Sequence, residues 1–146
     1  MFKHFFTTSL IHFSTSSLRL PPMPILLFGN PEVAADSLPP RLQSALAAAR
    51  PDLEFLTADP TENLPFDEDT VIVDTVINLE EPRLFTSLDD FAAAPRLTGH
   101  DYDVYAEMRW RQKLGKLKKV SIIGLPPNIS PDAAKNAVLE MLSDIL

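Results

Sequence analysis

Three residues in this sequence are candidates for a site of metal binding or acid–base chemistry: Asp36, Asp74 and His100. Asp36 follows an apolar run that ends in Gly-Asn, Asp74 directly follows a β-branched run, and His100 precedes a helical stretch. Two carboxylates and one imidazole suit a divalent transition metal that keeps open positions for substrate or water. The three residues therefore form a candidate site if the fold brings their separate loops together.

Each of these residues also has a purely structural interpretation. Asp36 could be the N-cap of the helix that begins near Pro39, which is a common position for Asp. Asp74 could complete a turn at the end of a strand, and His100 could be a loop residue at the start of a helix. Spacing in the sequence does not decide between these interpretations and a shared site.

The composition limits the chemistry of the chain. It has 146 residues, a net charge of -7, three His and no Cys. This length suits a single domain. The lack of Cys excludes disulfides, thiolate zinc sites, iron–sulfur clusters and cysteine nucleophiles. The acidic balance argues against a surface that binds nucleic acid.

Residues 1–22 differ in composition from the rest of the chain. They contain no Asp or Glu, are rich in Ser, Thr and Phe, and end in Pro21-Pro22. Met23 directly precedes a typical opening strand, so we interpret residues 1–22 as an extension outside the fold, or as the result of a mis-chosen start. Residues 23–146 are then a single domain with His100 as its one imidazole. No window approaches the roughly 20 apolar residues that span a bilayer, which excludes a membrane protein.

From Met23 onward, short apolar runs alternate with helical patterns. Strands are predicted at residues 25–28, 53–56, 70–73, 83–85 and 120–123. Helices are predicted after Pro39-Pro40, from about Asp101 to Leu114, and after Ser130-Pro131. Because most of the apolar runs are continuous, the pattern predicts an α/β fold of three layers. Its mostly parallel, twisted sheet has about five strands, with helices on both faces.

Such a sheet determines where a site would lie. The carboxyl ends of parallel strands meet at one edge, and the loops that follow them form the active sites of these folds. Gly29, Asn30, Glu32 and Asp36 follow the first strand, and Asp74 follows the third. Because these loops lie at the same edge of the predicted sheet, we expect Asp36, Asp74 and His100 to lie close together.

Four segments together resemble the hydrogenase maturation proteases over residues 24–146. They are Ile25-Leu26-Leu27-Phe28-Gly29-Asn30-Pro31 with the acid Asp36, Val71-Ile72-Val73-Asp74-Thr75-Val76, His100, and Ile122-Ile123-Gly124-Leu125-Pro126-Pro127. Members of this family are small α/β endopeptidases. They remove a C-terminal extension from the large subunit of nickel–iron hydrogenases once nickel has been inserted.

The resemblance assigns roles to the candidate residues. It implies that Asp36, Asp74 and His100 are both the metal-contacting and the catalytic residues, and that the nickel is carried by the substrate protein. It also implies a cytoplasmic enzyme whose partner is the precursor of the large subunit. With no Cys and no Gly-x-Ser-x-Gly motif, hydrolysis would use water that the carboxylates and the metal activate.

The sequence departs from the family pattern in two places. Ala35 stands where the first acid of a pair is usual, and Ser37 stands where a Gly is usual. The Gly-Gly turn after the second strand is replaced by Thr57-Ala58-Asp59-Pro60. These changes predict a divergent member, and they keep open a paralogue that binds a hydrogenase precursor without cutting it.

A second alternative is a receiver-like domain in which Asp74 accepts a phosphoryl group. Such a domain needs an acidic pair after the first strand and a Lys after the last, where this chain has Gly29-Asn30 and Gly124-Leu125-Pro126. We therefore rank it below the protease.

A cluster of cations, finally, interrupts the acidic chain between Arg109 and Lys119. Its ordinary interpretation is a solvated helix face and exit loop, and its functional one is a docking patch for an acidic partner. Trp110 lies between two Arg and either packs under their stems or, if exposed, anchors an interface.

Overall fold

The structure is a computed structural model that describes the backbone of residues 23–59, 64–92 and 99–146. The side chains in these ranges are described as well, except those of residue 92 and residues 99–103. The prediction for residues 1–22 lies outside the described residues. No helix in the described part of the chain is long and apolar enough to cross a membrane.

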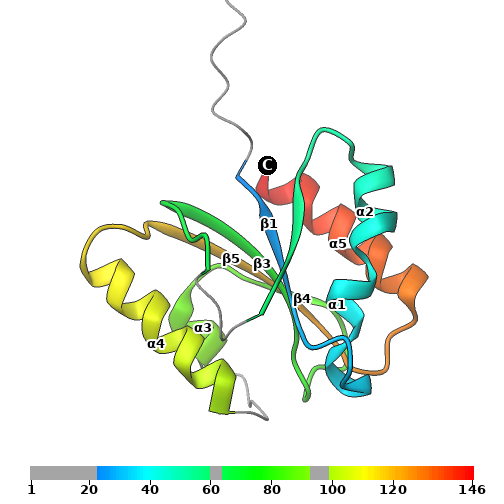
Figure 1. Cartoon of the computed structure of the whole chain (residues 1–146), viewed down its shortest axis with the longest axis horizontal. Helices are drawn as coiled ribbons and strands as arrows, with labels where there is room; N and C mark the ends of the chain where they lie inside the picture. Colours follow the sequence, from blue (N-terminus) through cyan, green and yellow to red (C-terminus); the bar gives the residue numbers. More distant parts are fainter. Residues whose placement is uncertain (1–22, 60–63, 93–98) are drawn as a thin grey trace, which may run out of the picture.

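One five-stranded sheet forms the centre of the molecule (Figure 1). The strands are β1 (Ile25–Phe28), β2 (Phe55–Ala58), β3 (Asp69–Thr75), β4 (Arg83–Phe85) and β5 (Lys119–Leu125). Their spatial order is β2-β1-β3-β5-β4, with β4 antiparallel to β5 and the other pairs parallel. The predicted α/β class and mostly parallel sheet are therefore confirmed.

The order of the strands reverses between β1 and β3. From β1 the chain continues to β2 on one side, whereas β3 lies on the other side of β1. Leu27 pairs with Val73, so Phe28 and Asp74 are the next positions along these two strands. Ligands of open α/β sheets bind outside the carboxyl ends of the strands at such a switch point. The fold thus places the ends of the first and third strands at its most probable binding edge.

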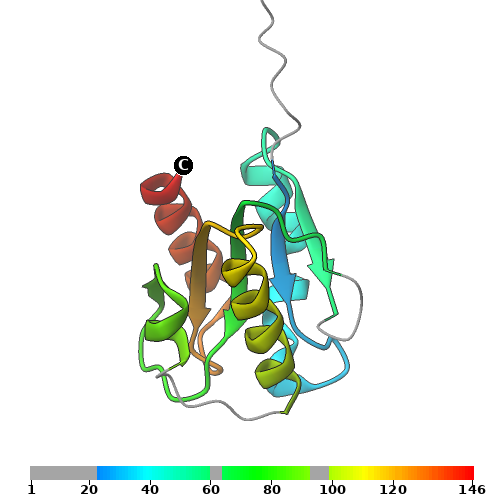
Figure 2. The same ribbon diagram turned by 90° about the vertical axis from the view of Figure 1, so that its left-hand side faces the viewer.

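Helices cover both faces of the sheet (Figure 2). One side carries the 3₁₀ turn η1 (Ala34–Asp36), α1 (Leu38–Arg41), α2 (Gln43–Ala49) and α5 (Pro131–Ile145), and the other carries α3 (Leu88–Ala92) and α4 (Gly99–Lys113). Ser130 is the N-cap of α5, and its Oγ accepts a hydrogen bond from the Ala133 N–H at 3.2 Å. Pro131 follows at the first helical position, as the sequence predicts.

The alternating side chains of the strands build a separate core on each face. Leu27 and Val73, both fully buried, pack against α1, α2 and α5. Phe28 and Ile72 point the other way and pack against α3 and α4. Because the buried strands supply side chains to both cores, their apolar runs are continuous instead of alternating.

Several element boundaries differ from the prediction. β2 begins at Phe55, two residues after the predicted start. The pairing with β1 sets this start, because Ile25 pairs with Phe55 and the Ile25 N–H donates to the Glu54 carbonyl. The helix after Pro39-Pro40 is divided into α1 and α2 at Leu42. α3, only five residues long, was not predicted.

The topology also bears on the receiver-like alternative. A flavodoxin-like receiver has the parallel order 2-1-3-4-5. Here the fourth strand is a short, antiparallel edge strand beyond β5. The receiver-like interpretation is therefore not supported.

Candidate functional site

Asp36 lies in the loop that follows β1, and a main-chain amide orients its carboxylate. The Asn30 N–H donates to Asp36 Oδ2 at 3.1 Å, and the Glu32 N–H donates to Asn30 Oδ1 at 2.9 Å. The Val33 N–H then donates to the Asn30 carbonyl at 3.1 Å. This chain of local hydrogen bonds fixes the loop, so the half-buried carboxylate of Asp36 has a defined position.

Gly29 allows the loop to fold back this closely. Its φ of 148° lies in a region that side-chain-bearing residues rarely adopt. A Cβ at Gly29 would lie 2.2 Å from the Asp36 carbonyl oxygen. The Asp36 carbonyl oxygen therefore occupies the space that a side chain at position 29 would need, at the carboxyl end of β1.

The interpretation of Asp36 as a helix N-cap is wrong. The N-cap of α1 is Ser37, which makes no side-chain capping hydrogen bond. The Ser37 hydroxyl instead donates to the Ala34 carbonyl at 3.2 Å and closes the 3₁₀ turn. Ser37 is 4% exposed, so the position where the family pattern has Gly is filled here by a buried hydroxyl.

The sequence predicts a strand that ends at Val73, whereas β3 extends to Thr75. Asp74 is therefore the penultimate residue of this strand. It is 7% exposed, and its Oδ1 accepts a hydrogen bond from the Thr75 N–H at 2.9 Å. A buried carboxylate is rare because it loses its hydration, and it persists when it is hydrogen-bonded or has a function. Asp74 is thus a stronger functional candidate than an acid in an exposed turn.

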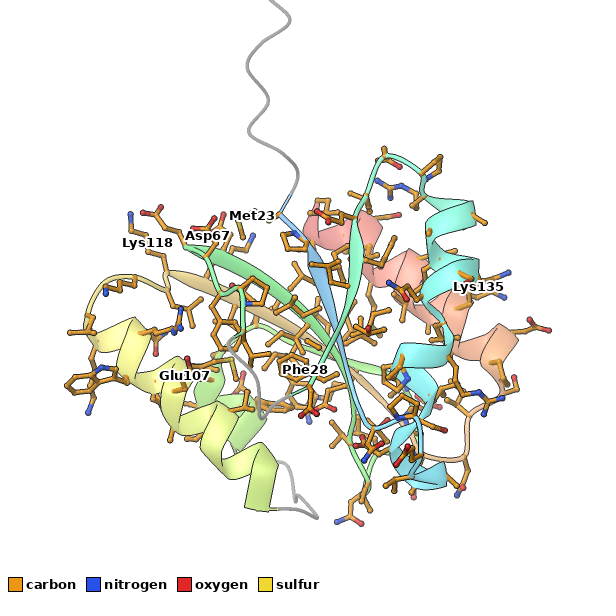
Figure 3. The ribbon with its side chains drawn as sticks, in the orientation of Figure 1. Met23, Phe28, Asp67, Glu107, Lys118 and Lys135 are labelled. Carbon is orange, nitrogen blue, oxygen red and sulfur yellow. The ribbon has the colours of Figure 1, made fainter. Side chains whose placement is uncertain are left out.

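The described side chains that line the hollow beside Asp74 are all apolar. Asp74 lines this small hollow between the sheet and the helices α3 and α4, and Phe28 lies at the centre of this region in Figure 3. The other lining residues are Ile72, Phe91, Val104, Met108 and Ile122. Such walls lower the local dielectric constant and strengthen any charge interaction of the carboxylate.

His100 is the second residue of α4, near its predicted position at a helix start. The first turn of α4 lies at the same end of the molecule as the carboxyl ends of β1 and β3 (Figures 1 and 2). The side chain of His100 lies outside the described residues. Among the side chains that the structure describes, no group of three His, Asp or Glu could hold a metal ion. Convergence of all three residues therefore stays a prediction.

A polar groove lies at the ends of β1 and β2, and the sequence interpretation did not find it. Asp36 does not line this groove, but Asn30, whose N–H donates to the Asp36 carboxylate, does. The groove has a volume of about 670 Å³, which is within the usual range for ligand sites. It is lined by Gly29, Asn30, Pro31, Glu32, Pro40, Arg41, Thr57, Ala58 and Asp59. The prediction that Thr57 and Ala58 lie in a turn after the second strand is wrong, because they are the last two residues of β2. Together with Asp59 they form one wall of this groove. The sequence does not identify Arg41 as a site residue, because Arg41 lies on a helix and not at the end of a strand.

Comparison with known proteins adds evidence from solved structures. No family model and no curated protein matches the sequence. The hydrogenase maturating endopeptidase HybD from E. coli superposes with a TM-score of 0.65 at 12% identity, over 85% of this chain and 91% of that chain. For the [NiFe] hydrogenase maturation protease HybD from Thermococcus kodakarensis the TM-score is 0.61 at 19% identity, over 85% and 98%.

A third similar structure is the hydrogenase 2 maturation peptidase from a Thaumarchaeota archaeon. Its TM-score is 0.51 at 20% identity, over 85% of this chain and 97% of that chain. The similarity covers nearly the full length of each of these proteins. The resemblance inferred from the four sequence segments is therefore confirmed for the fold: this chain has the fold of the hydrogenase maturation proteases.

Proposed function

We propose that this protein is an endopeptidase that removes the C-terminal extension from the large subunit of a nickel–iron hydrogenase after nickel insertion. One observation carries the proposal. The carboxylates of Asp36 and Asp74 are each oriented by a main-chain N–H at the carboxyl ends of neighbouring strands, in a fold shared with solved structures named as maturation endopeptidases.

Asp36, Asp74 and His100 are proposed to contact the nickel that the precursor carries. Carboxylate and imidazole groups suit a divalent transition metal, and the site would test whether the metal has been loaded. The metal would polarise the scissile carbonyl. The carboxylates would hold the attacking water and accept its proton as the water adds to the carbonyl carbon. They would then return this proton to the amine that leaves when the peptide C–N bond breaks. Since the chain has no Cys, this water, and not a thiolate, is the nucleophile in our proposal.

The substrate segment is proposed to approach through the polar groove at the ends of β1 and β2. This groove is continuous with the Gly29–Glu32 segment that holds Asp36. Its walls include both charged and uncharged polar side chains, which suit an extended peptide with exposed main-chain groups. The altered residues Thr57, Ala58 and Asp59 at the end of β2 would then affect which precursor is accepted.

The test uses the full chain and a purified, nickel-loaded large-subunit precursor. We expect Asp74→Asn and His100→Ala to abolish processing, measured as the mass of the precursor after incubation. Asp144→Asn, which changes an exposed acid near the C-terminus of α5, is the matched control and should process normally. Far-UV circular dichroism should show native folding for all three variants. Normal processing by either site variant would refute the proposed roles.

The non-cutting paralogue remains the second candidate because of Ala35 and Ser37. Ser37 is buried and hydrogen-bonded within η1, so the altered motif is structurally complete without its usual acid and Gly. The same mass measurement decides between the two functions. A wild-type chain that binds the loaded precursor but leaves its mass unchanged is a binding protein.

A further inference from the structure

The outer face of α4 exposes an apolar pair to solvent. Trp110 is 63% exposed and Leu114 is 50% exposed. Leu114 directly follows the last residue of α4, and its N–H donates to the Trp110 carbonyl at 3.1 Å, so the two side chains lie one turn apart. The exposed Ala106 lies one turn before Trp110. An exposed Trp is unusual in a monomer, and Trp is among the side chains most often found at the centre of protein interfaces.

Arg109 does not cover Trp110, because it is bound to the body of the protein. Its Nε donates to the Tyr105 hydroxyl at 2.7 Å, and its guanidinium forms an ion pair with Asp89 on α3. This arrangement ties α4 to α3 on the inner side of the helix. The interpretation in which Trp110 packs under the stem of this Arg is not supported.

Arg111 is also directed toward the body. Its Nε and Nη2 donate to Glu107 Oε1 at 3.1 and 2.8 Å, and its guanidinium lies 5.2 Å from the centre of the Phe66 ring. Glu107 is labelled on α4 in Figure 3. The two arginines therefore hold the helix in place while Trp110 between them points to solvent.

Cations flank the apolar pair on its C-terminal side, and Glu107, one turn before Trp110, is paired with Arg111. Lys113 and Lys116 are exposed, and no acid occurs in the sequence from Met108 to Lys119. The chain as a whole has a net charge of -7, so this surface is a local exception. We define the α4 outer patch as Ala106, Trp110, Lys113, Leu114 and Lys116. An apolar centre with two exposed lysines on one side is complementary to an acidic surface that has an apolar cleft.

Charge also decides against two other occupants. A symmetric dimer through this patch would bring the same lysines together, and like charges at an interface are repulsive. A nucleic acid would meet a chain whose remaining surface is strongly acidic, which opposes the binding of a polyanion. An acidic protein is therefore the partner that the charges favour.

The position of the patch connects it to the candidate site. α4 begins at Gly99, at the carboxyl-end edge of the sheet, and Trp110 lies about 16.5 Å further along the same helix at 1.5 Å per residue. A folded protein that brings one segment to this edge is wide enough to touch both places. We propose that the α4 outer patch docks an acidic surface of the protein substrate, away from the segment that is cut. This inference rests on the proposed function.

Binding of the nickel-loaded precursor tests the proposal, with the Asp74→Asn chain immobilised so that the precursor stays intact. We expect the added change Trp110→Ala to raise Kd about 30-fold, as for the loss of an interface anchor. Lys113→Glu with Lys116→Glu should mainly slow association and reduce its dependence on salt. Leu146→Ala and Lys135→Glu are matched controls elsewhere on the surface, and Lys135 lies on the opposite side of the molecule in Figure 3.

The outcomes separate the docking site from the proposed function. If the wild-type chain processes the precursor and the patch variants bind like the controls, docking at α4 is refuted while the function stands. If the precursor binds through the patch but is never cut, docking stands and the protease is refuted. If the precursor is neither bound nor cut, both are refuted. Trp110-dependent binding to duplex DNA or to vesicles containing phosphatidylserine would also overturn the assignment to a protein partner.

Discussion

Replacing Gly29 by Ala tests whether the β1 loop positions the carboxylate of Asp36. Two glycines of the described chain have a positive φ, Gly29 at 148° and Gly115 at 71°. A Cβ at Gly29 would lie 2.2 Å from the Asp36 carbonyl oxygen, whereas a Cβ at Gly115 would have no atom within 4 Å. Gly115→Ala therefore measures the cost of the backbone conformation alone, and Gly29→Ala adds a collision with the site.

The expected magnitudes follow from this difference. Gly115→Ala should lower the free energy of unfolding by about 1 kcal/mol, the cost of a left-handed conformation. Gly29→Ala should lower the free energy of unfolding by about 3 kcal/mol or more. Alanine adopts the φ of Gly29 less readily than that of Gly115, and the loop must also move to make room for the Cβ. That movement displaces Asp36 by roughly 1 Å, which should reduce kcat/KM for precursor processing about 100-fold. Gly115→Ala should process normally.

Urea unfolding followed by far-UV circular dichroism gives the free energies of unfolding. Fluorescence is a poor probe here, because Trp110, the one Trp of the chain, is already 63% exposed in the folded state. Equal destabilisation by the two substitutions would refute the close approach of Asp36 to Gly29. A stable Gly29→Ala chain with full activity would refute the positioning role of the loop.

Two further substitutions test the packing around the site. The Thr75 Oγ1 is buried and has no hydrogen-bond partner among the residues that the structure describes. Thr75→Val should therefore raise the free energy of unfolding by about 1 kcal/mol, and a loss of that size in urea unfolding would contradict this reasoning. Ser130→Ala removes the N-cap of α5 and should lower the melting temperature by about 3 °C; an unchanged melting temperature would show that the cap is not needed.

The sequence predicts the sheet well because burial on both faces leaves a direct signal. The runs at Ile25–Phe28 and in β3 are continuous and apolar, as two-sided burial requires. The start of β2 is set by pairing with β1, which no local pattern contains, and it was therefore misplaced by two residues. α3 has too few turns for a periodic signal. Its start is nevertheless marked by Ser87, whose Oγ accepts a hydrogen bond from the Asp90 N–H at 3.1 Å.

The two carboxylates of the candidate site are encoded in different ways. Asp36 is positioned by its own loop, through the Asn30 N–H and the glycine at position 29, so neighbouring residues in the sequence identify it. The position of Asp74 follows from its strand, but its burial depends on α3 and α4, which lie later in the chain. Sequence analysis could therefore name Asp74 but not describe its apolar surroundings.

This difference suggests that the two carboxylates have separate roles in the site. A carboxylate in a half-buried loop beside a polar groove can meet an incoming peptide with little rearrangement. A carboxylate on a central strand, beside an apolar hollow, is held rigidly and interacts strongly with any charge that enters that hollow. Rigid strands hold catalytic groups more accurately than loops do. We therefore expect Asp74 to be the rigidly held metal contact of the proposed site, and Asp36 to be the carboxylate that contacts the substrate first.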